Sequence, residues 1–319
     1  MYVNQVMRDR KLAVLALQET HLSDERAADL SLFFASTHTI HHSADPDNPH
    51  GSRGVAFVLD KRRLAGRTPT VHVIVPSRAL YLEYPWTPTK SLCLLNVYAP
   101  NAAAENAAFW ETVTENLRRS RLRRPDVLLG DFNVTLSALD RFPARSDAPC
   151  AVDALADALH GLDLIDSWRV AFPHDRLYTY RQYHSDTQSR LDRIYVRRHL
   201  QPLIADWAIE GPGPLSDHQL ILCSMANYQA PQVGKGRWMA PVTLLQDAVF
   251  VRTMKTLGFA LQRDLLALAG RSAERNPQLL LQAFKEDLVR QARQRLKEWV
   301  PKVDKQIAAL RERLHALQN

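Results

Sequence analysis

Short apolar runs rich in β-branched and aromatic residues recur through the first 230 of the 319 residues. Clusters of Gly, Pro, Asp and Ser separate these runs, as in DPDNPHGSRG and GPGPLSD. Apolar runs bounded by turn residues predict strands. The predicted strands are Leu12–Leu17, Val55–Leu59, Val71–Val75, Leu80–Tyr84, Leu92–Tyr98, Val127–Leu129, Ile194–Val196 and Leu220–Cys223.

Two helices are predicted between these strands. One is Ala103–Leu122, with Asn101 as its N-cap and Pro125 beyond its end, and the other is Val152–Leu159. Some predicted strands alternate, as in VHVIV, and others are continuously apolar, as in LCLLNV. This mixture is typical of two sheets packed face to face with helices outside, an α+β fold.

The pattern changes near residue 231, so we predict one domain over residues 1–230 and a helical tail over residues 231–319. From Leu244 to Asn319 the apolar positions recur at three- and four-residue steps, which predicts helix. Pro277 and Pro301 should break or kink it.

Charge divides the chain in the same place. The tail carries 16 Lys/Arg against 8 Asp/Glu, and the rest carries 25 against 26. A basic tail favours a polyanionic partner, although a linker or a solvated helical hairpin is the simpler interpretation.

Three widely spaced cysteines suit a reducing compartment, and neither a secretory h-region nor a membrane-spanning run is present. We therefore expect an intracellular protein, nuclear or cytoplasmic, that is not secreted and binds no membrane.

Four polar clusters stand at the ends of predicted strands: ALQETHL at 16–22, PDVLLGDFN at 125–133, SRLDRIYV at 189–196 and LSDHQLIL at 215–222. Strand-end carboxylates are good ligands for Mg²⁺, and a histidine beside acids can donate to a phosphate. Each cluster alone also fits a structural role, such as a turn or, for Asp192, a salt bridge to Arg190 or Arg193.

Taken in order, QET, NVYAP, GDFN, SRLDRIYV and SDH resemble the endonuclease/exonuclease/phosphatase superfamily from about Asn4 to Met225. GDFNVTLSALDR at 130–141, and LDLIDSWRVAFP at 162–173 followed by YTYRQYHSDTQSRLDRIYV, resemble more narrowly the endonuclease domains of LINE-type (non-LTR) retrotransposons, fungal ones above all. The helical segment after GKGRW at 234–238 resembles the linker that such elements place before a reverse transcriptase. The resemblance implies a four-layer α/β/β/α sandwich like that of DNase I, followed by the helical tail. It also implies an enzyme, a metal-dependent phosphodiesterase that nicks duplex target DNA.

The resemblance implies a metal site and a phosphate contact. Glu19 matches the metal-binding glutamate, and Asp217 matches an acid with a metal or leaving-group role. Tyr98 matches the tyrosine that contacts the scissile phosphate. The cofactor implied is Mg²⁺, with Mn²⁺ as the alternative.

Four further positions match the family's catalytic residues. Asp131 matches the aspartate that activates the attacking water or assists the leaving group, and Asn133 matches the asparagine that orients the same centre. Asp192 matches the aspartate that orients the catalytic histidine, His218. A divalent cation and a charged histidine would together neutralise the anionic transition state.

Two regions have weaker candidates. Tyr180, Arg181 and Tyr183 lie where the family contacts DNA, and an ordinary surface loop is an equally good interpretation. The histidines at 38, 41, 42 and 50 are irregularly spaced in a polar stretch, which predicts a solvated loop rather than a metal site.

The beginning of the chain departs from the family's pattern. Family members start with a strand that bears an asparagine, whereas only a helical stretch, Tyr2–Lys11, precedes the QET strand, and Asn4 within it is no match. We therefore expect the first strand to be missing, with low stability and weak activity.

Two alternatives to the retrotransposon endonuclease remain. One is an abasic-site endonuclease or other phosphoesterase of this fold, and the other is a truncated remnant that only binds nucleic acid. In a full element, an RNA or a reverse transcriptase would be a further partner.

Overall fold

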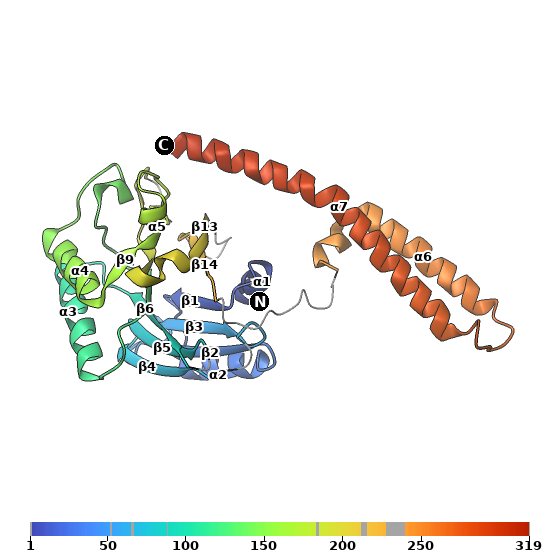
Figure 1. Cartoon of the computed structure of the whole chain (residues 1–319), viewed down its shortest axis with the longest axis horizontal. Coiled ribbons are helices and arrows are strands. Elements are labelled where there is room, and N and C mark those ends of the chain that lie inside the picture. The colour runs from blue at the N-terminus through green and yellow to red at the C-terminus, as the bar shows by residue number, and fades with distance from the viewer. Residues whose placement is uncertain are drawn as a thin grey trace. The chain divides into compact units, whose positions relative to one another are not determined.

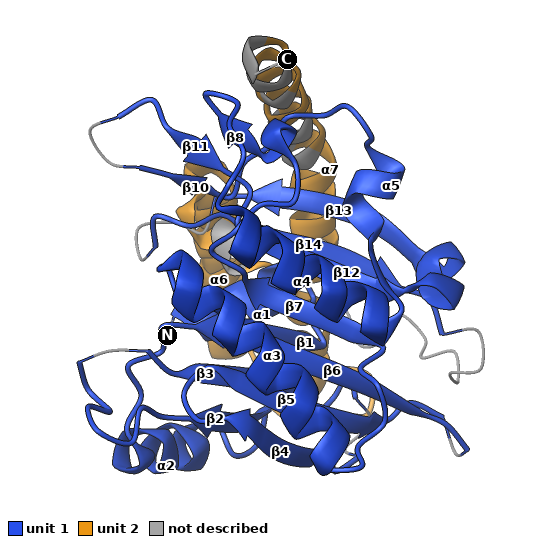
Figure 2. Ribbon diagram, turned by 90° about the vertical axis from the view of Figure 1, so that its left-hand side faces the viewer, with its two compact units in different colours: residues 1–230 blue, residues 231–319 orange. Residues whose placement is uncertain are grey.

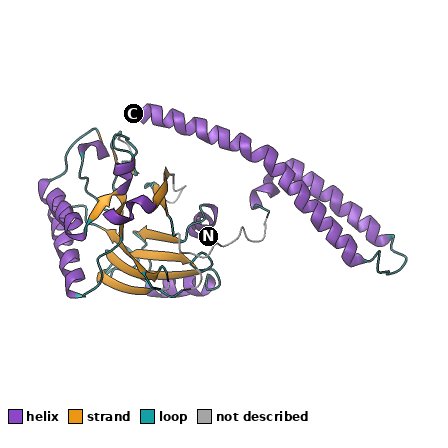
Figure 3. Ribbon diagram, viewed as in Figure 1, coloured by secondary structure: helices purple, strands orange, loops and turns teal. Residues whose placement is uncertain are grey.

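The computed structural model describes residues 2–51, 53–64, 67–87, 89–182, 185–211, 216–227 and 240–318. The chain divides into two compact units, Met1–Ala230 and Pro231–Asn319, which are shown in different colours in Figure 2. The first unit is a sandwich of sheets and helices, and the second is helical (Figure 3).

In its described residues, the first unit contains two main sheets and two small ones. The first main sheet has the order β1-β3-β2, with β1 at Val14–Gln18, β3 at Val55–Asp60 and β2 at His38–Ser43. The second has the order β4-β5-β6-β7-β12-β9, with bounds Thr70–Val75, Ala79–Pro85, Ser91–Tyr98, Val127–Asp131, Asp192–Arg197 and Leu164–Asp166. β6 and β7 are parallel, and the other pairs are antiparallel. The small sheets are β13-β14, at Ile204–Glu210 and Leu220–Met225, and β10-β11-β8, at Tyr180–Arg181, Gln188–Ser189 and Arg141–Phe142.

Helices cover the outer faces of the main sheets (Figure 1). They are α1 at Tyr2–Asp9, α2 at Asp24–Phe33, α3 at Ala103–Arg119, α4 at Pro149–Leu162 and α5 at Ser167–Ala171, with 3₁₀ turns η1 at Ala138–Asp140 and η2 at Arg198–Leu203. Figure 2 shows α3 and α4 side by side over the six-stranded sheet.

Three apolar cores separate four layers. Along β5, Tyr81 packs in the core shared with α3 and α4, and the next residue, Leu82, packs in the core shared with Phe57 of β3. Strand alternation sends neighbouring side chains to opposite faces, so one strand contributes to both cores. A third core joins Met7 of α1 to Leu15 of β1. The predicted α/β/β/α sandwich is confirmed.

Two local predictions for this unit were wrong, and one helix was missed. The stretch with His38, His41 and His42 forms β2 rather than a loop, because pairing with β3 outweighs its polar composition. The N-cap of α3 is Ala102, not Asn101, and no side chain caps it. α2 was not predicted, although Ser23 caps it by accepting from the Arg26 amide at 3.3 Å.

β1 is an edge strand within the described residues, since it pairs only with β3, and the described residues before it form α1. Apolar side chains of α1 cover its outer face through Met7. A cavity of about 570 Å³ lies along α1 and β1, lined by Leu15, Leu17 and Val58 among others, and its wall includes Asp192 and His218.

The second unit consists of η3 at Val242–Gln246, α6 at Ala248–Leu266 and α7 at Pro277–Gln318. α6 and α7 pack through Phe250 and Ala292, and Arg295 forms a 2.8 Å ion pair with Asp247, the N-cap of α6. Pro277 begins α7, as its missing amide allows, but Pro301 lies inside the helix and does not end it. Among the described helices of both units, none combines the length and the apolarity needed to cross a lipid bilayer.

Candidate active site

Asp131 and Asp192 form the centre of the site. Asp131 is the last residue of β7 and Asp192 is the first of β12, and the two are partners in the antiparallel ladder. Ladder partners present their side chains on the same face, so both buried carboxylates share one space. Burial, and after it the charge of Asp192, raises the pKa of Asp131 above the usual 3.8.

His218 completes this centre from the segment that leads into β14. Its Nδ1 lies 2.8 Å from Oδ2 of Asp192, and because a carboxylate only accepts, Nδ1 carries the hydrogen. Burial would lower the pKa of His218, but the hydrogen bond to Asp192 and its charge outweigh that effect and raise the pKa to about 9. The ring of Tyr180 packs against the imidazole, with ring centroids 4.8 Å apart.

Tyr98 and Glu19 lie on the other side of Asp131. Tyr98 ends β6 and is the parallel register partner of Asp131, and its hydroxyl donates to a carboxylate oxygen of Glu19. Burial, then the bond to Glu19, raises the pKa of Tyr98, and the charge of Asp131 contributes to this rise. The structure thus brings Glu19, Tyr98 and Asp131 together, although 79 residues separate Glu19 from Tyr98.

Asn133 is fixed by backbone geometry. It has a positive φ of 52°, a conformation that asparagine tolerates better than most residues. Its amide donates to Oδ1 of Asp131 at 2.9 Å, and its Nδ2 donates to the carbonyl of Ala99, also at 2.9 Å. Phe132 between them is fully buried, as the alternation predicts. The tight turn therefore holds Asn133 beside Asp131.

Arg78 and Thr179 support the site and were not predicted. Nη1 of Arg78 donates to the Tyr98 carbonyl at 3.0 Å, and its guanidinium lies 5.2 Å from the centroid of the Tyr98 ring. Oγ1 of Thr179 accepts from the amides of Leu191 and Asp192, both at 2.9 Å. Sequence spacing gave no signal for either residue, because strand pairing creates both contacts.

The remaining candidates lie at the edge of the site or beyond it. Asp217 is exposed, and its charge contributes to the raised pKa of His218. Arg181 on β10 is 68% exposed, and its Nη2 lies 3.9 Å from Oδ1 of Asp186. Tyr183 lies outside the described residues.

The donor set fits a hard divalent cation. Among the described residues, ligand atoms of Asp131, Asp192 and His218 lie within 4.8 Å of one another. His218 is bound to Asp192, so its Nδ1 is not free to act as a ligand. The charge of Glu19 also acts on Asp131. Carboxylate oxygens crowded in this way suit Mg²⁺ or Mn²⁺, because a cation relieves their mutual repulsion.

Asn96 holds the strand that leads to Glu19 against the strand that bears Tyr98. Its side chain is fully buried, donates to the carbonyls of Leu17 and Ala56, and accepts from Nε2 of Gln18 at 2.6 Å. We predict that Asn96→Ala lowers the free energy of unfolding by about 3 kcal/mol, because the half-buried carbonyl of Leu17 and the buried carbonyl of Ala56 lose this donor.

Urea denaturation monitored by circular dichroism measures this effect. Asn101→Ala is the matched control and should change stability by less than about 0.5 kcal/mol, since Asn101 is exposed and caps no helix. Equal stability of the two variants would contradict the proposed role of Asn96.

The chain belongs to the Endonuclease/Exonuclease/phosphatase family, whose profile matches residues 2–218. In sequence it is 28% identical, over 253 residues, to a Xenopus laevis protein described as "Transposon TX1 uncharacterized 149 kDa protein". That alignment covers 78% of this chain and 18% of the relative, so the chain spans about a fifth of the relative's length.

Solved structures show the same DNase I-like fold. The AP endonuclease LMAP from Leishmania major superposes with a TM-score of 0.60 at 18% identity, covering 71% of this chain and 82% of that one. The endonuclease domain of TRAS1, a telomere-specific non-LTR retrotransposon, superposes with a TM-score of 0.52 at 15% identity, covering 71% of this chain and 92% of that one.

Proposed function

We propose that this chain is a DNA endonuclease that hydrolyses one phosphodiester bond of duplex target DNA in non-LTR retrotransposition, with Mg²⁺ or Mn²⁺ as its cofactor. The observation that carries the proposal is the convergence of Asp131, Asp192 and His218 at the ends of β7, β12 and the lead into β14. The family and the retrotransposon relatives of the chain support it.

In the proposed mechanism, His218 stabilises the developing charge on the phosphate. Asp192 holds Nδ1, so Nε2 can donate to a non-bridging phosphate oxygen. The electrostatic effect of Asp192 favours the charged imidazolium, which donates more strongly than a neutral ring. Asp192 therefore acts through His218, and Asp217 adds negative charge beside the ring.

Asp131 takes a proton from the attacking water, whose oxygen forms a bond to phosphorus as the bond to the leaving sugar oxygen breaks. The leaving oxygen keeps the electron pair of that bond and takes a proton from solvent water. Asn133, fixed beside Asp131, orients the same water or phosphate through its side chain. Tyr98 directs its hydroxyl into the site from β6.

Glu19 and Asp131 are the carboxylates that would hold the cation, with Asp217 at the rim. A bound divalent cation supplies positive charge that stabilises the pentavalent phosphate. Both carboxylates interact with the phenol of Tyr98, which places them around one position.

Binding of duplex DNA is assigned to Tyr180 and Arg181 on β10. Tyr180 contacts His218, and the neighbouring Arg181 is exposed and positively charged, as a phosphate contact requires. Residues 231–319 are proposed to be a basic helical linker that connects this domain to a reverse transcriptase in a longer element, acting in the nucleus or cytoplasm. We propose an RNA as a further partner of the chain in such an element.

An abasic-site endonuclease is the second candidate, because an AP endonuclease shares the fold. Two end-labelled duplexes, identical except for a single abasic site, separate the candidates when cleavage is followed in Mg²⁺ and in EDTA. We expect the intact duplex to be nicked at a rate within about tenfold of the abasic one and EDTA to stop both reactions, since hard-oxygen ligands release Mg²⁺ to chelators.

Cleavage confined to the abasic duplex would overturn the retrotransposition role in favour of repair. Salt-dependent binding without any cleavage in Mg²⁺ would overturn the enzymatic proposal and favour a remnant that only binds nucleic acid. The complete set of Asp131, Asp192, His218 and Tyr98 argues against that remnant.

A further inference from the structure

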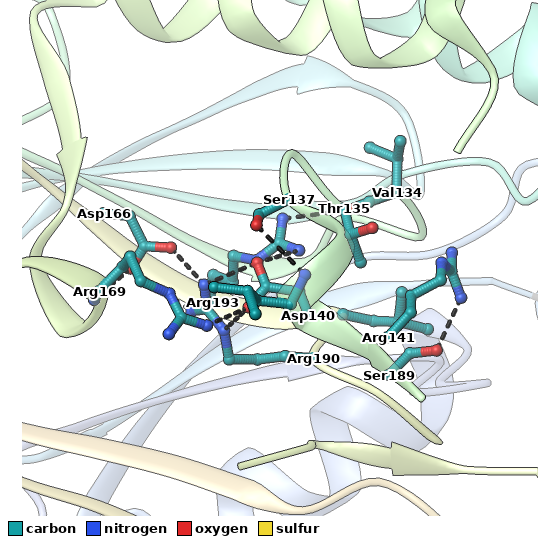
Figure 4. Close-up of polar contacts among 12 residues, drawn as sticks. Val134, Thr135, Ser137, Asp140, Arg141, Asp166, Arg169, Ser189, Arg190 and Arg193 are labelled. Atoms are coloured by element: carbon teal, nitrogen blue, oxygen red, sulfur yellow. Dashed lines mark hydrogen bonds and ion pairs between the residues drawn. The ribbon is translucent and has the colours of Figure 1, made fainter. Parts of the chain in front are cut away.

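Asp140 is the centre of a buried ion network that includes Arg169, Arg190 and Arg193 (Figure 4). The residue belongs to η1 and is 3% exposed. Its two carboxylate oxygens accept from Nε and Nη2 of Arg190, at 2.8 and 3.0 Å, and Oδ1 also accepts from Nη2 of Arg169 at 2.5 Å. One carboxylate therefore binds two guanidinium groups directly.

Arg190 connects this carboxylate to the start of β12. Its backbone amide donates to the Asp140 carbonyl at 2.8 Å, and its Nη2 donates to Asp166 at 2.5 Å. Its guanidinium also lies 4.7 Å from the centroid of the Trp168 ring. Asp140 belongs to η1 and Asp166 is the N-cap of α5, so Arg190 binds both of these elements. Arg190 lies two residues before Asp192 in the sequence.

Arg193 makes the corresponding connection on the other side of Asp192. It is fully buried, and its Nη1 donates to the Val134 carbonyl at 3.0 Å and to the Tyr195 hydroxyl at 3.1 Å. Its Nη2 lies 3.6 Å from Oδ2 of Asp140. Val134 directly follows Asn133, so this contact joins the turn that bears Asn133 to β12.

The two arginines flank Asp192 without contacting it, since Asp192 is bound to His218 instead. The network thus spans the turn that directly follows Asp131, the last residue of β7, and the first residues of β12, which begins at Asp192. Burying several charges is costly, and apolar residues of similar size often stabilise a fold as well or better. Such a network is therefore better suited to fixing geometry than to adding stability.

We propose that Asp140 is a positioning residue, which through Arg190 and Arg193 locks the turn at Asn133 against β12 and so aligns Asp131 with Asp192 and His218. The proposal rests on the proposed nuclease function. The side-chain hydrogen bonds and ion pairs of Asp140 go to Arg169, Arg190 and Arg193 and not to Asp131 or His218, so its effect on the site passes through the segments that it joins.

The test is steady-state nicking of a labelled duplex by Asp140→Asn, in Mg²⁺ at 15 °C, with the folded state verified by circular dichroism. Asparagine keeps the shape of the side chain but no longer neutralises the guanidinium groups. Misplacement of reacting groups by about 1 Å can cost on the order of 10² in rate, so we expect kcat to fall by about that factor. We expect KM for DNA to change by less than about threefold, because the exposed DNA-binding residues are untouched.

Asp126→Asn is the matched control. Asp126 is a buried carboxylate just before β7 that accepts from the Cys93 amide at 2.9 Å and lies 3.8 Å from Arg197 of β12, at the end of the two strands away from the site. It should lower stability while leaving the kcat of the folded protein within about twofold of wild type. Arg193→Lys is the second variant. It keeps the charge, but its single nitrogen cannot replace both Nη1, which donates to Val134 and Tyr195, and Nη2, which lies beside Asp140, so it should lower kcat in the same way.

The positioning role would be overturned if folded Asp140→Asn kept the kcat of wild type. If Asp140→Asn does not fold, the same result in Arg193→Lys would overturn it. An equal loss in Asp126→Asn would overturn it too, because the effect would then be general. Failure of the wild-type chain to nick DNA is a separate result that refutes the proposed function instead.

Discussion

Asp131→Asn is expected to lower the rate of DNA nicking by about 10²–10³, the loss typical of removing one preorganised group from a transition state. Asparagine matches aspartate in size and can still accept from the Asn133 amide, so the turn should keep its shape. It cannot take a proton from water, and it binds a hard cation less well than a carboxylate. The measurement is single-turnover cleavage of a labelled duplex in Mg²⁺.

The same substitution should not destabilise the fold. Burial and the charge of Asp192 raise the pKa of Asp131 in the folded protein, so its charged form costs stability, and this cost grows as the pH rises above 3.8. In EDTA, we therefore expect Asp131→Asn to melt at or above the wild-type temperature at pH 7.5, with the difference disappearing near pH 4.

Asp126→Asn serves as the control here as well, because it changes a buried aspartate beside the same strand without touching the site. Nicking by Asp131→Asn within about tenfold of wild type would show that Asp131 has no part in the reaction.

Gly130→Ala is expected to lower the free energy of unfolding of the first unit by at least about 4 kcal/mol, among the larger effects of a single substitution. Gly130 has a φ of +136°, which residues with a Cβ rarely adopt, and a Cβ there would lie 2.0 Å from the Val97 carbonyl oxygen. Neither Val97 nor the glycine can move easily, because β7 pairs with both β6 and β12 at this point.

Thermal denaturation measures the consequence, and a fall in melting temperature of roughly 10 °C or more is expected for a unit of this size. Gly161→Ala in α4 is the control: nothing lies within 4 Å of its added methyl group, and the change should stabilise the helix by about 0.5–1 kcal/mol. A Gly130→Ala protein as stable as wild type would mean that β6 and β7 approach each other less closely than described.

Much of the fold follows from local pattern. The runs Val55–Leu59, Leu80–Tyr84 and Leu92–Tyr98 lie within strands of the structure, because each is apolar on both faces and is buried between layers. β2 and β13 were missed because they are only partly buried, and their sequences lack the continuous apolar residues that identify a buried strand.

The candidate site also has a part that the sequence predicts and a part that it does not. GDFN and SDH mark strand ends, so the placement of Asp131 and His218 beside strands was predictable. The partners of Arg190 and Arg193 were not: a salt bridge to the adjacent Asp192 was the simple interpretation, whereas both arginines lie against Asp140, about 50 residues earlier. Such contacts depend on the register between β12 and the turn after β7, which local sequence does not specify.

The central claim is that one hydrolytic centre, built around Asp131, Asp192 and His218, holds a divalent cation. Anomalous scattering from crystals of the chain grown with Mn²⁺ tests it most directly. The account predicts a peak within about 2.5 Å of carboxylate oxygens of Glu19 and Asp131. A clear map with no peak at these carboxylates, or with Mn²⁺ bound only elsewhere on the chain, would contradict it.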